Sequence, residues 1–335
     1  MCYQDFVSTL EGVRTKPFDP LLHDVDLPLS GTYYAQGFPV EITTNSHEVL
    51  EAAAESWGMY KREFDRKPLE LRIVVQPQGD LAPEPSFRGQ RGYFSIISDR
   101  DNFALYASST TFAFCFVSEK TAADHSWFRF YFLETMVYML LAQHYVVPVH
   151  AACVARHGSG VLLCGLSGAG KSTLSFACAR AGWTFVGDDS TWLLPDEDDR
   201  TAVGRPHLAR FRDDAPGIFP ELTGYVPRAR PNGKLSIEVS LSEFPHIRTA
   251  SRCRVGCLVL LDRHSGGGAR AEAVPSSEVV ERMLQDTPSY GDEVNDRVDR
   301  TVRRLLSVPA YRLTYGALDE AVTVLSDLNH NTEEQ

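Results

Sequence analysis

The pattern of apolar and polar residues changes near residue 125. Before it, short segments alternate apolar and polar positions or run apolar, as half-buried strands do. These segments lie at residues 39–44, 69–75, 92–97 and 103–107. A helix is expected at residues 46–60, where apolar side chains recur at helical spacing, and a Pro- and Gly-rich loop at residues 76–91. We therefore predict a strand-rich α+β region over residues 1–124.

Longer elements alternate in the second half of the chain. A helix at residues 125–145 leads into an apolar hairpin with strands at residues 147–155 and 161–164. Further strands are expected at residues 184–189, 191–194, 255–261 and 311–315, and further helices at residues 172–180, 279–284, 297–306 and 318–328. This alternation is typical of an α/β domain, which we place at residues 125–330, before a disordered tail at residues 331–335.

Composition narrows the class of protein. The 335 residues suggest two domains, and the net charge of −11 argues against a nucleic-acid partner, because phosphate backbones are bound by dense Lys and Arg surfaces. The N-terminus shows no signal peptide. The most apolar stretch, residues 127–141, contains Arg129 and Glu134 and is shorter than the ~20 residues of a membrane span. We predict a cytoplasmic protein without a membrane partner, whose scattered cysteines are reduced thiols.

Residues 165–173 carry the most specific motif of the chain. They read Gly-Leu-Ser-Gly-Ala-Gly-Lys-Ser-Thr and fit G-x-x-x-x-G-K-[ST], a phosphate-binding P-loop, between a predicted strand and a predicted helix. In such a loop, backbone N–H groups wrap the phosphates of ATP, the lysine reaches the β- and γ-phosphates, and the Ser hydroxyl ligates Mg²⁺. The predicted nucleotide-binding residues are Gly165, Ser167, Gly168, Ala169, Gly170, Lys171, Ser172 and Thr173. The alternative is a chance match in an ordinary glycine turn.

Two carboxylates follow the next predicted strand. Asp188 and Asp189 end that strand, which puts them at the same sheet edge as the glycine-rich loop, where open α/β sheets bind ligands. One carboxylate there can hold Mg²⁺, and the other can accept a proton from an attacking hydroxyl. The alternative is that both merely open a turn, where Asp is common.

A histidine lies inside the first strand of the predicted hairpin. His150 sits in an apolar run whose hairpin partner leads into the glycine-rich loop, so its side chain is a candidate neighbour of the γ-phosphate. The alternative is a core histidine whose ring nitrogens are satisfied by nearby groups.

Three segments together resemble the catalytic core of bacterial HPr kinase/phosphorylase. They are Val149-His150-Ala151-Ala152, the loop at residues 165–172, and Val186-Gly187-Asp188-Asp189, in the same order and at similar spacing. The resemblance covers residues 145–195. It implies a P-loop kinase core akin to that of ATP-dependent phosphoenolpyruvate carboxykinase, with ATP and Mg²⁺ as cofactors.

The same resemblance implies a role for each site residue. Lys171 and the loop amides would bind phosphate, and Ser172 would ligate Mg²⁺. Asp188 would be the general base toward a serine hydroxyl of a protein or peptide. Asp189 would assist with the metal or by hydrogen bonding, and His150 would support the base or the phosphate.

Three features depart from that family. Thr173 stands where the family usually has an acidic residue, the downstream glycine-containing signature associated with dephosphorylation is not recognisable, and residues 1–120 do not look like the family's N-terminal domain. We therefore expect a divergent member that acts only as a kinase, on an acceptor such as a biosynthetic precursor peptide. The alternatives are a small-metabolite kinase of the shikimate-kinase type and a non-catalytic nucleotide-binding regulator.

The segment at residues 204–233 is rich in Pro, Gly and Arg, and we predict an irregular active-site segment there. Arg230 and Lys234 are candidate phosphate or substrate contacts, because a transferring phosphoryl group needs extra positive charge. The alternative is a solvated surface loop. The N-terminal region is expected to be either an acceptor-recognition module or a surface for homo-oligomerisation.

Overall fold

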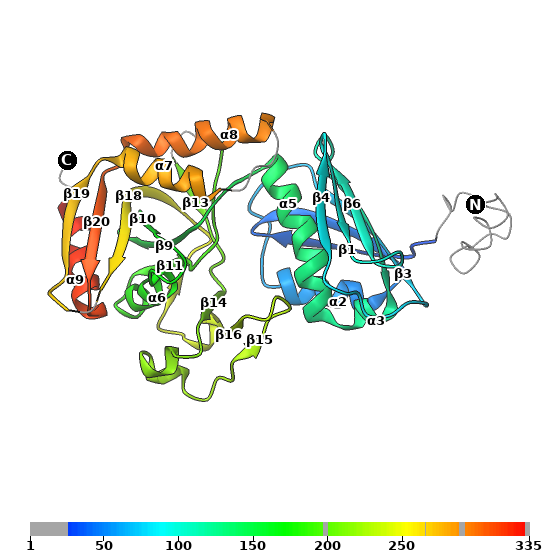
Figure 1. Cartoon of the computed structure of the whole chain (residues 1–335), viewed down its shortest axis with the longest axis horizontal. Helices are drawn as coiled ribbons and strands as arrows, with labels where there is room; N and C mark the ends of the chain where they lie inside the picture. The colour runs from blue at the N-terminus through cyan, green and yellow to red at the C-terminus, as the bar shows by residue number, and fades with distance from the viewer. Residues whose placement is uncertain (1–25, 197–199, 265, 288–291, 332–335) are drawn as a thin grey trace. The chain divides into compact units, whose positions relative to one another are not determined.

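The computed structural model of the chain describes residues 26–196, 200–264, 266–287 and 292–331 (Figure 1). Contacts divide the chain into two compact units, Met1–His144 and Tyr145–Gln335. Both units combine helices with sheets, so the structure is mixed α/β. Of the tail expected at residues 331–335, residues 332–335 lie outside the described residues, and Asn331 ends a helix.

The first unit is built on a seven-stranded sheet in the order β1-β2-β3-β7-β6-β5-β4. Its strands are β1 (Leu29–Ala35), β2 (Phe38–Thr44), β3 (Leu69–Gln76), β4 (Ser86–Gln90), β5 (Tyr93–Ile97), β6 (Phe103–Ala107) and β7 (Phe112–Ser118). Strand β4 corrects the loop expected at residues 76–91. All five of its residues are exposed, so the strand shows no alternation of buried and exposed positions, and it is defined by antiparallel pairing with β5.

Helices cover one face of this sheet (Figure 1). They are α2 (His47–Trp57), α3 (Glu119–Ala123), α4 (His125–Phe128), the π-helix η2 (Arg129–Leu133) and α5 (Glu134–His144). Residues 125–144 were expected in the second domain, yet they belong to the first unit. The reason is packing: α4 and η2 contact α2, and α5 contacts β3. Trp57, Phe132 and Leu140 are fully buried there.

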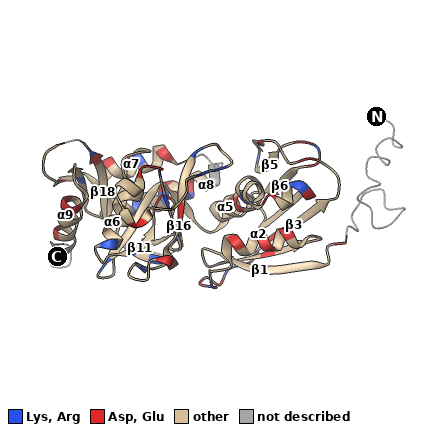
Figure 2. Ribbon diagram, turned by 90° about the horizontal axis from the view of Figure 1, so that it is seen from below, with Lys and Arg blue, Asp and Glu red and all other residues tan. Residues whose placement is uncertain are grey.

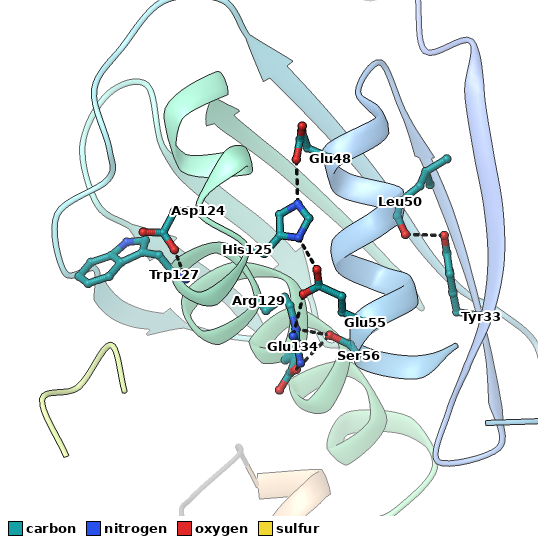
Figure 3. Close-up of polar contacts among 10 residues, drawn as sticks. All are labelled: Tyr33, Glu48, Leu50, Glu55, Ser56, Asp124, His125, Trp127, Arg129 and Glu134. Carbon is teal, nitrogen blue, oxygen red and sulfur yellow. Dashed lines mark hydrogen bonds and ion pairs between the residues drawn. The ribbon is translucent and has the colours of Figure 1, made fainter. Parts of the chain in front are cut away.

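A charged cluster joins α4 to α2 within the first unit (Figure 3). The ring of His125 lies between two carboxylates of α2, with Nε2 2.8 Å from Glu48 Oε2 and Nδ1 2.7 Å from Glu55 Oε1. Arg129 Nη1 donates to the other oxygen of Glu55 over 2.9 Å. Because both ring nitrogens face carboxylates, both can donate a hydrogen bond when the imidazole is protonated. Partial burial lowers the pKa of His125, but the hydrogen bonds with Glu55 and Glu48 outweigh it and raise that pKa.

The second unit is built on a ten-stranded sheet that contains the order β17-β11-β9-β10-β18-β13-β12-β8, with β20 pairing β18 and β19. Its strands are β8 (Val147–Val149), β9 (Ala151–Arg156), β10 (Ser159–Cys164), β11 (Thr184–Gly187), β12 (Thr191–Leu193), β13 (Thr201–Val203), β17 (Arg248–Thr249), β18 (Arg252–Arg263), β19 (Arg270–Val274) and β20 (Ala310–Tyr315). The strand expected at residues 147–155 is interrupted at His150, because β8 pairs with β12 while β9 pairs with β10 and β11.

Helices cover both faces of this second sheet (Figure 1). They are α6 (Lys171–Arg180), α7 (Ser276–Asp286), α8 (Asp292–Arg303) and α9 (Leu318–Asn331), with the short 3₁₀ turn η6 (Arg304–Ser307) after α8. Alternate residues of β9 serve the two layers: Cys153 packs in the cluster of α7 and α8, and Val154 in that of α6 and α9. Two covered faces explain why β9 and β10 read as continuous apolar runs.

A three-stranded sheet packs against α6. It consists of β14 (Leu208–Phe211), β16 (Leu235–Ser240) and β15 (Arg228–Ala229), and the 3₁₀ turns η3 (Ala215–Gly217), η4 (Pro220–Leu222) and η5 (Leu241–Glu243) accompany it. Phe176 of α6 contacts the rings of Phe211, Phe219 and Phe244 at centroid distances of 5.0, 5.0 and 5.8 Å. The segment at residues 204–233 is therefore partly strand, anchored to α6 by aromatic packing.

Two further observations bear on the expectations from composition. Among the described residues, none of the helices combines the length and apolar character that a membrane crossing requires. The six cysteines within the described ranges are all free thiols.

Candidate functional site

The ends of neighbouring strands meet at one edge of the second unit's sheet. Ala151 of β9 lies opposite Cys164 of β10, so His150 precedes β9 at the edge where the glycine-rich loop leaves β10. Strand β11 pairs with the other side of β9 and is followed directly by Asp188 and Asp189. The topology therefore brings the histidine, the loop and the two carboxylates to the same edge.

The loop between β10 and α6 depends on two glycines. Gly168 and Gly170 have φ angles of 90° and 94°, a left-handed conformation that glycine adopts at little cost. A Cβ on Gly170 would also lie 2.5 Å from the hydroxyl oxygen of Tyr315. That hydroxyl donates to the carbonyl of Ala169 over 3.2 Å, which fastens the loop to the end of β20. Ser167, also expected at the site, is exposed in this loop.

Lys171 begins α6 and is buried, with 5% of its surface exposed. Its Nζ donates to the carbonyls of Gly165, over 2.9 Å, and Leu166, over 3.4 Å. Burial lowers the pKa of Lys171, and the nearby negative charge of Asp189 opposes that shift. The ammonium group is thus held inside the curve of the loop.

Asp188 is also buried, with 7% of its surface exposed. Its Oδ2 accepts a hydrogen bond from the backbone N–H of Arg210 over 2.7 Å. Burial raises the pKa of Asp188 to about 6, although the hydrogen bond and charge of Arg210 act in the opposite direction. The hydroxyl of Ser172 donates to the backbone carbonyl of Asp188 over 3.4 Å and so links α6 to the end of β11.

Asp189 differs from its neighbour in environment. Its Oδ1 lies 2.9 Å from His150 Nε2, and the two side chains are 58% and 39% exposed, respectively. Partial burial raises the pKa of Asp189, but the hydrogen bond with His150 and the charges of His150 and Lys171 outweigh it and lower that pKa. Asp189 is therefore the more acidic of the two adjacent carboxyl groups.

Arginines in and next to the three-stranded sheet add local positive charge. Basic and acidic positions are interspersed over both units (Figure 2). Near Asp188, however, the charges of Arg205 and Arg210 both act to lower the pKa of this carboxyl group. Arg210 Nε also pairs with Glu238 Oε1 at 2.6 Å. Burial and the charge of Arg210 lower the pKa of half-buried Arg230, while Glu238 and Asp189 raise it.

The remaining candidate residues, Arg230, Lys234 and Thr173, lie in different surroundings. Arg230 interacts electrostatically with Asp189, whereas Lys234 is exposed, and no contact among the described residues joins its side chain to the carboxylates or His150. Thr173 lies half-buried in the first turn of α6.

Two further groups at the site were not predicted. Sequence reasoning missed the backbone donor of Arg210, for which no sequence signal exists. It also missed Tyr315, which could have been found at the end of a predicted strand.

The arrangement combines groups that suit phosphate chemistry. The loop and Lys171 can neutralise an anion, and the partly protonated carboxyl of Asp188 can exchange a proton near neutral pH. Mg²⁺ is usually held by one or two carboxylates together with phosphates and water. The hydroxyl of Ser172 and the carboxylate of Asp189 are oxygen donors of this kind at the same edge, so the residues fit the ion.

Comparison with known proteins gives three results. Residues 113–208 match the model of a family described as SynChlorMet cassette protein ScmC. The chain is similar to the solved structure of the Hpr(Ser) kinase/phosphatase from Coxiella burnetii, with 13% sequence identity and a TM-score of 0.29, over 56% of this chain and 98% of that chain. A TM-score this low does not establish a shared fold. Comparison with curated proteins gave no match.

Proposed function

We propose that this chain is an ATP- and Mg²⁺-dependent kinase that transfers the γ-phosphate to a hydroxyl group, a serine of a protein or peptide. One observation carries the proposal: the glycine-rich loop with its buried lysine lies at the same sheet edge as a buried aspartate whose pKa is raised to about 6. This carboxyl group supports the proposal, because it could accept the proton of an attacking hydroxyl group.

The loop and the start of α6 would bind the triphosphate. The backbone N–H groups at residues 165–170 and the ammonium of Lys171 would neutralise its charge, aided by the N-terminal dipole of α6. Ser172 and Asp189 would hold Mg²⁺, which when bound would offset charge on the β- and γ-phosphates. On the acceptor side, Arg230 would add positive charge where the phosphoryl group is transferred.

Asp188 would take the proton of the attacking hydroxyl. A base works best when its pKa lies near the working pH, and burial brings the pKa of Asp188 to about 6. The backbone N–H of Arg210 donates to one carboxyl oxygen, Oδ2, so Oδ1 would be the oxygen that accepts the proton. His150 would orient Asp189 through their hydrogen bond, and Asp189 in turn would hold the metal beside the base.

The acceptor would be a serine of a protein or of a biosynthetic precursor peptide. The proposal rests on the resemblance of residues 145–195 to HPr kinase/phosphorylase, with the departures at Thr173 and in the N-terminal region pointing away from HPr itself. The matching family is described as a cassette protein, which directs the search for an acceptor to genes adjacent to that of this chain.

The test is transfer of labelled γ-phosphate from ATP to peptides encoded by adjacent genes. We expect labelled phosphoserine with the wild type and none with Asp188→Asn, while Asp319→Asn, an exposed aspartate of α9, transfers normally. Label on small molecules of a metabolite extract, and on no peptide, would identify a metabolite kinase instead. Binding of ATP with no transfer to either pool would identify a non-catalytic regulator.

A further inference from the structure

A second feature of the same sheet edge lies on the opposite side of the loop from His150 and Asp188. Strand β18 runs parallel to β10, with Leu260 opposite Cys164, and β20 runs parallel to β18, with Tyr315 opposite Arg263. The ends of β18 and β20 therefore reach the edge beside the loop, and β9 and β11 reach it from the other side.

An open pocket of about 390 Å³ lies at these strand ends. Its lining residues come from the loop, β18, α7 and β20, and include Leu166, Arg263, Arg282 and Arg312. The volume falls within the range of about 300–1,000 Å³ that is usual for small-molecule sites.

The lining combines an apolar surface with a cationic rim. Leu166 leaves 61% of its surface exposed on the loop itself and so offers an apolar contact surface beside the pocket. Of the three arginines, Arg312 pairs with Glu278 and Arg282 lies 3.9 Å from Asp286. Arg263 is exposed at the end of β18. Apolar contacts and guanidinium groups together suit a planar aromatic ring attached to phosphates, because guanidinium stacks on such rings.

We infer that this pocket holds the nucleoside of a nucleoside triphosphate, so that the nucleotide lies across the loop from β18 and β20 toward β11. The inference rests on the proposed function, because it takes the loop to bind the triphosphate. The nucleoside contacts Leu166 and Arg263, and the γ-phosphate points to Asp188. The pocket thereby makes Leu166 and Arg263 determinants of nucleotide affinity that take no part in phosphoryl transfer.

Calorimetric titration of the full chain with ATP and with inorganic tripolyphosphate, both with Mg²⁺, tests this inference. We expect Arg263→Ala and Leu166→Ala each to weaken ATP binding about fivefold, as loss of one stacking contact or one apolar contact does. Both variants should change tripolyphosphate binding by less than about twofold, because that ligand has no nucleoside. The matched control is Arg270→Ala, which removes an exposed arginine of β19 that does not line the pocket.

The inference would be overturned if Arg263→Ala and Leu166→Ala weakened the binding of ATP and of tripolyphosphate equally, or weakened the binding of neither. Either result would leave the proposed function standing. If instead the wild type bound neither ligand, or Lys171→Ala left the binding of both unchanged, the proposed function itself would fail. Photolabelling with 8-azido-ATP gives an independent readout. We expect label on peptides that contain the ends of β18 or β20, and label only on β11 or β14 would contradict the orientation.

Discussion

His150 Nε2 and Asp189 Oδ1 lie 2.9 Å apart, although one residue precedes β9 and the other follows β11. This contact helps to give Asp188 and Asp189, two adjacent residues, different pKa values. The hydrogen bond with His150 lowers the pKa of Asp189, whereas burial raises the pKa of Asp188 to about 6. Neighbouring carboxyl groups whose pKa values are pushed apart are a recurrent basis for assigning acid, base and charge-stabilising roles.

The first prediction concerns the proposed base. Asp188→Asn should reduce the rate of phosphoryl transfer at least about 100-fold, the usual contribution of general-base catalysis, and change ATP affinity little. Lys171→Ala should weaken both binding and transfer, because its ammonium lies within the loop. Single-turnover transfer and calorimetric ATP titration measure the two effects separately. Full transfer activity in Asp188→Asn would remove Asp188 from the mechanism.

The second prediction is a gain in stability for the same variant. The folded-state pKa of Asp188, about 6, exceeds its ordinary value of 3.8, so ionisation of this group opposes folding as pH rises through that interval. Asp188→Asn removes the cost, and its free energy of unfolding without Mg²⁺ should exceed that of the wild type by up to about 3 kcal/mol at neutral pH. The difference should vanish below about pH 4. Denaturant titration at both pH values measures it, and a less stable variant at neutral pH would contradict the burial argument.

The third prediction is the pH dependence of transfer. Asp188 accepts a proton only when ionised, so kcat/KM should fall tenfold per pH unit below the pKa of about 6. The initial rate at low ATP concentration, followed from about pH 5 to about pH 8, gives the profile. An acidic limb with its midpoint near pH 4 would mean that burial does not shift the base.

The fourth prediction tests the coupling of His150 to Asp189. His150→Ala and Asp189→Asn should each slow transfer. The double variant should be about fivefold faster than the rate expected if the two effects simply multiplied, because substitutions of residues in contact do not have independent effects. His246→Ala, a histidine elsewhere in the second unit, serves as the partner in a control cycle with Asp189→Asn. Strictly additive effects of His150→Ala and Asp189→Asn would show that their contact has no part in catalysis.

The fifth prediction concerns the charged cluster of α2 and α4. The raised pKa of His125 means that its hydrogen bonds stabilise the fold fully below the ordinary value of 6.5 and are lost as pH rises through the folded-state pKa. His125→Gln should therefore lower the Tm by about 2–4 °C at about pH 6, and the gap should close at alkaline pH. His264→Gln, an exposed histidine of the second unit, is the control. A gap that stays constant with pH would mean that His125 acts by packing alone.

Sequence alone could predict the parts of this structure that carry strong local signals. The hairpin of β9 and β10 consists of two apolar runs joined by a tight turn at His157 and Gly158. The φ angles of these two turn residues are 50° and 82°. The loop after it has a specific motif, and Asp188 and Asp189 directly follow a strand of the same sheet. These features do assemble at one edge, as strand order and register determine.

The features that the sequence does not predict depend on strand pairing and packing that leave no periodic pattern of apolar residues. The residues of β4 are all exposed, so only its backbone bonds to β5 define the strand. The break at His150 arises because β8 and β9 pair with different strands, whereas the sequence on both sides is uniformly apolar. An apolar helix face does not reveal which sheet it covers, so the sequence alone does not predict that residues 125–144 belong to the first unit. The N–H of Arg210, which binds Asp188, is a backbone group that any residue but proline would offer.

The most direct measurement of the central claim is transfer of the γ-phosphate from labelled ATP, with Mg²⁺, to serine-containing peptides encoded beside the gene of this chain. Phosphoserine is detected by mass spectrometry, and the wild type is compared with Asp188→Asn under identical conditions. We expect labelled phosphoserine with the wild type and none above background with Asp188→Asn. Equal labelling by both proteins, or no labelled peptide with the wild type, would contradict this assignment.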